Sequence, residues 1–196
     1  ISDTDGASDY VLENSANGTV VGISAFASDA DGTDTASYSL DDSAGGRFTI
    51  DGVTGIVTVT GAIDREAAGT YSITVRATST DTSTVTRVFA ITIGDVNEFT
   101  VTSPADTDAT ANTVNENAAN GTAVGITASA SDADATTNAI TYSLTDNAGG
   151  RFGINATTGV VTVADGTLLD RENAASHNIT VRATSADGST ADTVFT

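Results

Sequence analysis

Short runs in which apolar and polar residues alternate recur along the chain. Residues 71–77 place Tyr, Ile, Val and Ala on one face and Ser, Thr and Arg on the other, which is typical of a half-buried strand. Comparable runs span residues 19–26, 36–40, 48–50, 56–60 and 85–93. No segment of useful length shows helical periodicity. About seven short strands separated by Gly, Asp, Asn and Ser predict an all-β fold, an antiparallel sandwich of Greek-key type.

This pattern occurs twice. Residues 11–19 return as residues 114–122, and the correspondence continues through nearly all of the second half, interrupted only by short insertions between predicted strands. Self-similarity at this period indicates tandem domains of about 100 residues each. We therefore expect two Greek-key sandwiches of about seven strands each, at residues 1–94 and 100–196, joined by a linker at residues 95–99. The predicted last strand of the second copy is shorter than its counterpart, so we expect it to lack its end.

Composition and charge narrow the classes of function. The 196 residues include 26 Asp and Glu against seven Arg and no Lys, a net charge of −19 that repels nucleic acid and anionic membranes. No apolar run approaches the roughly 20 residues needed to span a bilayer, so we expect no direct membrane insertion. Without Cys, disulfides cannot brace two small cores, and a bound metal is one of the usual substitutes.

Carboxylates recur at matched positions in the two copies. Asp29 and Asp31 are separated by a single residue, as are Asp64 and Glu66, and alternate residues of a strand project to the same face. Such pairs repel one another unless a cation neutralises them, and oxygen-only ligation favours calcium over zinc. The sequence therefore predicts calcium sites. An EF-hand loop does not fit, because no Glu stands at the twelfth position counted from Asp29.

The motifs of each copy, taken in order, resemble the cadherin repeat. In the first copy they are Glu13, Asp29-x-Asp31, Phe48-x-Ile50-Asp51, Asp64-Arg65-Glu66, Tyr71-x-Ile73-x-Val75 and Asp95-Val96-Asn97-Glu98. The second copy repeats all but the last of these. The chain resembles the cadherin-like repeats in the extender regions of bacterial RTX and biofilm adhesins in three respects. It has few aromatic residues, abundant Thr and Asp, and near-identical neighbouring copies.

This resemblance implies that calcium binds between successive repeats. The complete junction would take its ligands from both copies and the linker, namely Glu13, Asp64, Glu66, Asp95, Asn97, Glu98, Asp132, Asp134 and Asp187. Half-sites toward neighbouring repeats would be formed by Asp29, Asp31 and Asp81 and by Glu116, Asp170 and Glu172. Further candidates, for the junction or for a separate site, are Asp3, Asp5, Asp106 and Asp108. The family linker ends in Asn-Asp-Asn, whereas here Glu98 and Phe99 follow Asn97, so one expected oxygen ligand is missing.

The resemblance implies a calcium-binding, calcium-rigidified extender of a bacterial cell-surface adhesin that serves cell adhesion and biofilm formation. Its partners would be neighbouring repeats of the same chain, its location extracellular and its state monomeric. The alternative is a calcium-dependent module that binds polysaccharide, or the same repeat on another cell. A third hypothesis is the acidic structural domain of a halophile, whose carboxylates are solvated and hold no specific metal.

An enzyme is not expected. Asp64 with Glu66 could be read as the carboxylate pair of a glycosidase, but the chain has no Trp to line a sugar cleft. His177 is the only histidine, and its counterpart in the first copy is Tyr71, so we expect a ring with a structural role there. The chain has no Cys and no second His, so it does not contain the residues of a typical zinc site or of the usual nucleophile–base pairs.

Overall fold

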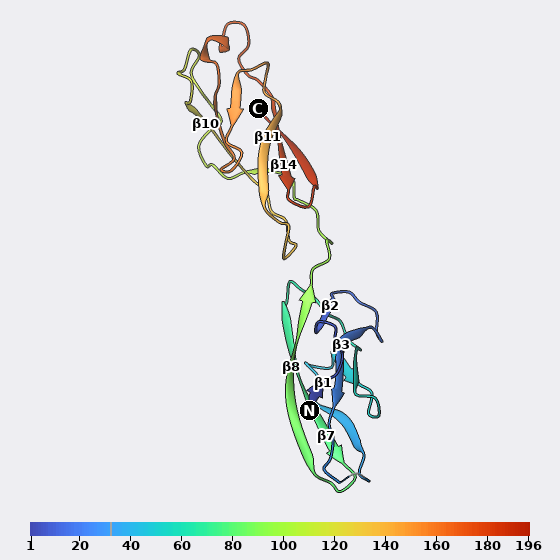
Figure 1. Cartoon of the computed structure of the whole chain (residues 1–196). Coiled ribbons are helices and arrows are strands. Elements are labelled where there is room, and N and C mark those ends of the chain that lie inside the picture. Colours follow the sequence, from blue (N-terminus) through green and yellow to red (C-terminus); the bar gives the residue numbers. More distant parts are fainter. Residues whose placement is uncertain (32) are drawn as a thin grey trace. The chain divides into compact units, whose positions relative to one another are not determined.

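Two compact units, Ile1–Val96 and Asn97–Thr196, make up the chain in the computed structural model, which describes residues 1–31 and 33–196. Each unit is a sandwich of two β-sheets (Figure 1). The all-β fold predicted from the alternating pattern is confirmed, because the helical structure among the described residues is limited to the three-residue 3-10 turn η1 (Gly166–Leu168).

Unit 1 consists of two four-stranded sheets. The first has the order β1-β3-β6-β5, with strands Ser2–Asp3 (β1), Val20–Phe26 (β3), Phe48–Ile50 (β5) and Ile56–Val59 (β6). The second has the order β2-β8-β7-β4, with strands Tyr10–Leu12 (β2), Ala36–Asp42 (β4), Thr70–Ser79 (β7) and Thr84–Gly94 (β8). Neighbouring strands are antiparallel except that β2 runs parallel to β8.

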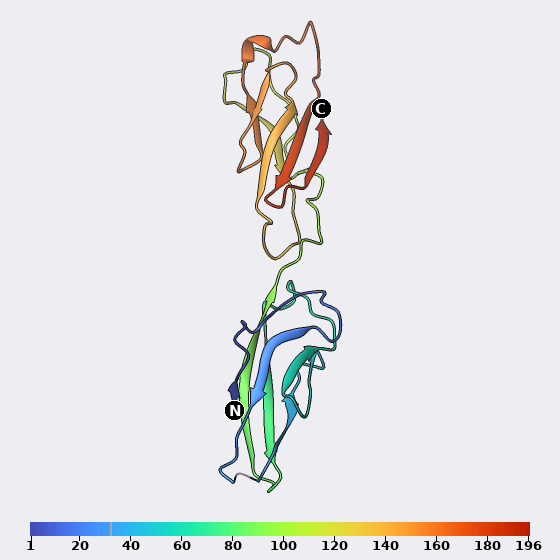
Figure 2. The same cartoon turned by 45° about the vertical axis from the view of Figure 1, so that its right-hand side comes forward.

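Unit 2 repeats this arrangement with one strand fewer. Its first sheet has the order β12-β13-β10-β9, with strands Ala105–Asp106 (β9), Ala123–Ser129 (β10), Phe152–Ile154 (β12) and Val160–Val163 (β13). Its second sheet has the order β11-β14-β15, with strands Ile140–Asp146 (β11), Ile179–Ser185 (β14) and Thr190–Phe195 (β15). Figure 2 shows β14 and β15, in red tones, paired side by side.

The two units differ at the end of the last strand. In unit 1, β2 pairs with residues 92–94 of β8 and closes that edge of the sheet. In unit 2, β15 ends at Phe195, and residues 113–115 form no strand. A hollow of about 850 Å³ in unit 2 is lined in part by Val114 and Phe152.

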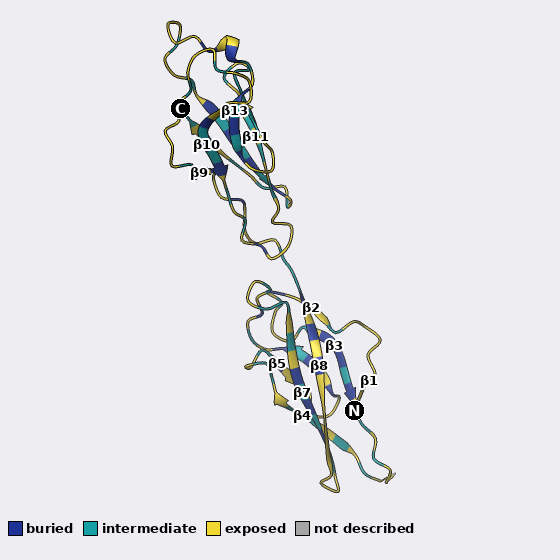
Figure 3. Cartoon of the chain, turned by 90° about the vertical axis from the view of Figure 1, so that its left-hand side faces the viewer, coloured by how far each residue is buried: buried dark blue, intermediate teal, exposed yellow. Residues whose placement is uncertain are grey.

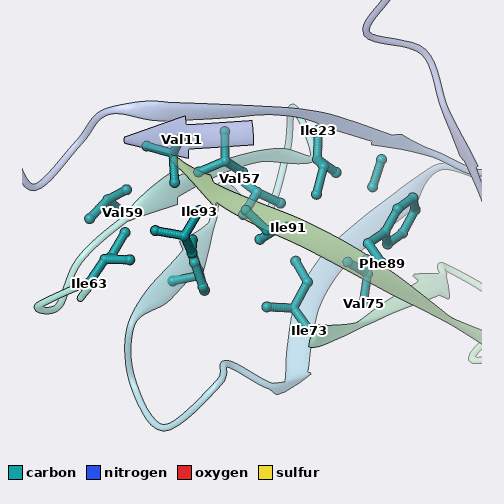
Figure 4. Packing of buried hydrophobic residues seen from close by; sticks show 13 residues of the cluster. Val11, Ile23, Val57, Val59, Ile63, Ile73, Val75, Phe89, Ile91 and Ile93 are labelled. Carbon is teal, nitrogen blue, oxygen red and sulfur yellow. The ribbon is translucent and has the colours of Figure 1, made fainter. Parts of the chain in front are cut away.

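Apolar side chains from both sheets of unit 1 meet between them (Figure 4). Ile23 and Val57 come from the first sheet and Ile73, Val75 and Ile91 from the second, and none of them is more than 1% exposed. The matching core of unit 2 is formed by Val124, Ile126, Ala128, Val161, Val163, Leu169, Ile179 and Val181. Figure 3 shows buried residues concentrated in the strands and exposed residues along the loops, so each unit has its own core.

Strand β7 carries the alternation that the sequence predicts. Ile73, Val75 and Ala77 are buried, and the polar residues between them are half-exposed. Tyr71, predicted on the same face, lies at the margin of the core, where its ring meets Phe48 edge-on at 6.2 Å between centroids. The apolar face of the strand therefore covers the core over four alternate positions.

One glycine in each unit is required by the hairpin turn of its first sheet. Gly55 has a φ of +71° and Gly159 a φ of +69°, a region that favours glycine. A Cβ atom at either position would lie 2.1 Å from a backbone oxygen, that of Ala25 or of Ala128. The Thr-Gly pairs that the sequence repeats are thus explained by both conformation and close approach.

Replacement of Ile73 by Ala should lower the free energy of unfolding of unit 1 by about 2–5 kcal/mol, because it leaves a cavity between the sheets. Urea denaturation followed by circular dichroism measures the change. Val88→Ala is a matched control on the same sheet, since Val88 is 63% exposed and its truncation should cost about 0.5 kcal/mol or less. Equal losses in the two variants would contradict the assigned core.

Candidate metal sites

Four groups of carboxylates are brought together in the described part of the chain, two in each unit. Within each group the nearest oxygens of three residues lie within 4.8 Å of one another. Unit 1 holds the Glu13 cluster (Glu13, Asp64, Glu66) and the Asp29 cluster (Asp29, Asp34, Asp81). Unit 2 holds the Glu116 cluster (Glu116, Asp170, Glu172) and the Asp134 cluster (Asp132, Asp134, Asp187).

The Glu13 cluster lies where β8 ends. Glu13 follows β2, and its own amide donates to the carbonyl oxygen of Gly94 at 3.0 Å. Its carboxylate is 2% exposed and accepts two backbone amides, that of Arg65 at 2.6 Å on Oε2 and that of Val96 at 2.8 Å on Oε1. Asp64 is exposed, and its Oδ1 accepts an amide of its own turn. The cluster therefore combines one buried, fixed carboxylate with two exposed ones.

The Asp134 cluster contains the most deeply buried carboxylate of unit 2. Asp134 is 1% exposed, and its Oδ1 accepts the amides of Glu98 at 3.0 Å and Phe99 at 3.3 Å. Its Oδ2 is buried and has no hydrogen-bond donor, and the same holds for Oδ2 of Asp132. An ionised oxygen that is buried without a donor is costly. A hard cation with oxygen ligands fits this donor set, because it would satisfy both atoms at once.

Asp187 completes that cluster from the turn between β14 and β15. Its carboxylate accepts the amide of Ser189 at 2.7 Å and the side-chain amide of Asn97 at 2.8 Å. The Ser189 amide, with the Ser189 hydroxyl and Asn97 after it, lowers the pKa of Asp187 below its usual value. The group is therefore ionised at neutral pH and available as a ligand.

The Asp29 cluster differs from the group predicted from the sequence. Asp29 and Asp81 come together as expected, but the third member is Asp34, while Asp31 is exposed and stands outside the group. The amide of Asp34 donates to the carbonyl oxygen of Asp31, and this turn carries the Asp34 carboxylate toward the cluster.

The Glu116 cluster is more open than its counterpart. All three members are exposed, and Glu116 accepts the amide of Arg171 at 3.0 Å, as Glu13 accepts that of Arg65.

The nine residues predicted to form one junction are divided between the units. Unit 1 carries Glu13, Asp64, Glu66 and Asp95. Unit 2 carries Asn97, Glu98, Asp132, Asp134 and Asp187, and all of these except Asn97 and Glu98 belong to the Asp134 cluster. Asn97 and Glu98 contact that cluster through hydrogen bonds.

The other acidic pairs fix local backbone. Oδ1 of Asp3 accepts the amides of Asp5 at 3.0 Å and Ser24 at 2.9 Å. In unit 2, Oδ1 of Asp106 likewise accepts two amides, those of Asp108 and Thr127, each at 3.0 Å. Asp5 and Asp108 each cap the amide two residues on. These four residues lie outside the four clusters, and each is occupied with backbone hydrogen bonds.

One partner of Asp3 was missed by the sequence reasoning. Asp9 is hydrogen-bonded to Asp3, and burial, followed by the negative charge of Asp3, raises the pKa of Asp9. Asn112 is the matched residue in unit 2, and its amide, oriented to satisfy both neighbours, donates to Asp106 at 3.1 Å and to the carbonyl oxygen of Gly125 at 2.9 Å. Unit 1 thus has two carboxyl groups where unit 2 has a carboxylate and an amide.

His177 has the structural role expected of it. Its ring lies against Phe152 with 6.3 Å between centroids, which matches the packing of Tyr71 against Phe48 in unit 1. The residue belongs to none of the four groups of acids.

The sequence profile of the cadherin domain matches residues 9–93 and 110–195, one match in each unit. The chain belongs to the cadherin family. Human protocadherin Fat 4 is 34% identical over 184 residues, which cover 89% of this chain and 4% of that protein. Human protocadherin Fat 1 is 36% identical over 142 residues, which cover 70% of this chain and 3% of that protein. The chain therefore spans only a few per cent of the length of these cadherin relatives.

Solved structures of cadherins have the same fold. Mouse cadherin-23 EC22-24 gives a TM-score of 0.74 at 27% identity, covering 95% of this chain and 60% of that chain. Chicken VE-cadherin EC1-2 gives a TM-score of 0.67 at 24% identity and covers 94% of each chain. The predicted pair of tandem cadherin-like sandwiches is confirmed.

Membership of the cadherin family fixes a general function. Cadherin domains are extracellular adhesion modules rather than enzymes, and they generally bind calcium between successive repeats. The part of the chain that the structure describes holds no helix long and apolar enough to cross a membrane. The relatives and solved structures named above come from human, mouse and chicken, so the assignment to a bacterial adhesin stays a prediction.

Substituting Asp9 by Asn should stabilise unit 1 at neutral pH by about 1 kcal/mol, because an amide can donate to Asp3 without a proton from solvent. The folded state binds the Asp9 proton more tightly than the unfolded chain does. Unit 1 therefore loses stability as the pH rises above the ordinary carboxyl pKa of about 4, and the gain in the variant should shrink as the pH falls toward it.

Urea denaturation at pH 4 and pH 7, in chelator, measures this effect. Asn112→Asp is the matched control in unit 2 and should have the opposite sign at pH 7. A gain in Asp9→Asn that is equal at both pH values would contradict the shared hydrogen bond.

Proposed function

We propose that this chain is a calcium-rigidified extender segment of a cell-surface adhesin. The observation that carries the proposal is the Asp134 carboxylate, which is 1% exposed. Its Oδ2 has no hydrogen-bond donor, and the oxygens of two more carboxylates within 4.8 Å add repulsion. If the acids only formed a solvated surface, such a carboxylate would be exposed to water. A bound dication supplies the charge that the local hydrogen bonds do not.

Like-charge repulsion makes the clusters sensitive to calcium. Each brings three carboxylates together, and seven Arg residues cannot neutralise 26 acids along the chain. In the proposed junction, calcium takes oxygen ligands from the Glu13 cluster and Asp95 of unit 1 and from Asn97, Glu98 and the Asp134 cluster of unit 2. Ligands drawn from two units and one linker would restrict the angle between the units. Extracellular calcium modules bind with dissociation constants of about 10⁻⁴ to 10⁻³ M, which suits calcium levels outside cells.

The proposal of a bacterial cell surface rests on the composition of the chain. The chain has no Cys and no Trp and carries a net charge of −19, features that we associate with the cadherin-like repeats of bacterial surface adhesins. We propose an extracellular, monomeric segment on a bacterial surface whose partners are neighbouring repeats. The Asp29 and Glu116 clusters, with Asp31 beside the first, would then serve junctions to those repeats.

A second candidate function is calcium-dependent binding of a polysaccharide or of the same repeat on another cell. A hollow of about 540 Å³ in unit 1 is lined by Phe26, Val53 and Ile56 next to Asp29 and Asp34. Phe26 is 52% and Val53 85% exposed, and unit 2 has Ser and Thr at the two matched positions. A glycan array and a concentration series in sedimentation, each with calcium and with chelator, separate this function from a passive spacer.

Removing the charge of Asp134 should abolish most of the calcium-induced rise in the melting temperature of unit 2. Asp134→Asn is the sharpest variant, because its remaining carbonyl oxygen can still accept the amides of Glu98 and Phe99. Differential scanning calorimetry across a calcium titration, at fixed ionic strength, measures the shift.

His177→Ala is the control, since that ring packs on Phe152 and should leave the calcium dependence unchanged while lowering the melting temperature itself. A wild-type melting temperature that depends on ionic strength but not on calcium would contradict the proposal. It would favour the solvated acidic domain of a halophile.

Calcium should also change the distribution of shapes in solution. Small-angle X-ray scattering of the whole chain should give a longer and narrower distribution of distances with calcium than with chelator, because repulsion no longer drives the units to pivot. Sodium chloride at matched ionic strength is the control. An identical maximum dimension in all three buffers would exclude rigidification.

A further inference from the structure

The Glu13 carboxylate joins two parts of the chain that are distant in sequence. Its Oε2 accepts the amide of Arg65, 52 residues away, and its Oε1 accepts the amide of Val96, 83 residues away. Val96 lies just beyond the end of β8, where no ladder hydrogen bond holds the chain. One side chain therefore ties the turn after Ile63 to the segment by which the chain leaves unit 1.

Both hydrogen bonds are of the strong kind. They connect backbone donors to an ionised acceptor at 2.6 and 2.8 Å, and the group is 2% exposed. No metal is needed to satisfy these oxygens as hydrogen-bond acceptors. Asp64, in the same cluster, is exposed and caps only its own turn, so it does not hold the exit of the chain.

The next linker residues are anchored to unit 2 in a similar way. The amides of Glu98 and Phe99 donate to Asp134, and the side chain of Asn97 donates to Asp187. The anchored residues are thus consecutive in sequence, with Val96 held by unit 1 and Asn97 held by unit 2.

We propose that Glu13 is a positioning residue, which fixes the course of the linker on unit 1 in the absence of metal. Asp95 is then held beside the Glu13 cluster before any cation arrives, and this consequence rests on the proposed calcium function. The anchoring itself does not depend on calcium. Gln cannot replace Glu here, because its amide nitrogen would face one of the two donors.

Amide hydrogen exchange of the labelled whole chain, in chelator at neutral pH, tests the proposal. In the wild type the Val96 amide should exchange at least about tenfold more slowly than in a free peptide, and Glu13→Gln should remove about tenfold of that protection. The core amide of Ile73 should be unaffected in the variant, which separates loss of the anchor from loss of the fold.

Asp64→Asn is the charge-matched control, because it removes one charge from the same cluster without touching the Val96 bond. Free exchange of Val96 in the wild type would overturn the proposal even if Glu13→Gln fails to fold, and so would equal losses of protection in Glu13→Gln and Asp64→Asn. If the anchor is found in chelator but neither variant weakens the calcium-induced melting shift, the anchor stands and the proposed calcium function fails.

Discussion

Repulsion among carboxylates held within 4.8 Å of one another is the constraint to which each unit is adapted. Like charges so close raise the free energy of the folded state, so other interactions must hold the segments that carry them. The apolar cores provide that support, and backbone amides meet part of the charge, as at Glu13 and at Oδ1 of Asp134. Among the atoms that they leave without a donor are Oδ2 of Asp134 and Oδ2 of Asp132, both buried.

The fold was readable from the sequence because its determinants are local and periodic. The alternation along β7 and the repeated Thr-Gly turns report on strand faces and hairpins directly. The candidate site was readable only in part. That Asp34 rather than Asp31 joins Asp29 depends on the path of a loop, which no period encodes. The hydrogen bond from Val96 to Glu13 joins residues 83 positions apart and is set by tertiary packing.

Near-identity of the two copies makes each a reference for the other. Where the copies agree, as in the two amides accepted by Asp3 and by Asp106, the residue serves the sandwich itself. Where they differ, the difference isolates one interaction, as when Asn112 in unit 2 replaces Asp9 of unit 1, whose pKa is raised by burial and by the charge of Asp3.

The parallel pairing of β2 with β8 determines how unit 1 responds to tension. A pull that reaches the start of β2 and the end of β8 acts along the two strands in opposite directions. Hydrogen bonds between parallel strands loaded in this way are stretched together, in shear, whereas those of a hairpin opened from one end break in succession. The amide of Glu13, which donates to Gly94 directly after this pairing, adds one more bond to the sheared row. A stretching force applied in this way is therefore carried by the whole row of hydrogen bonds between β2 and β8 at once.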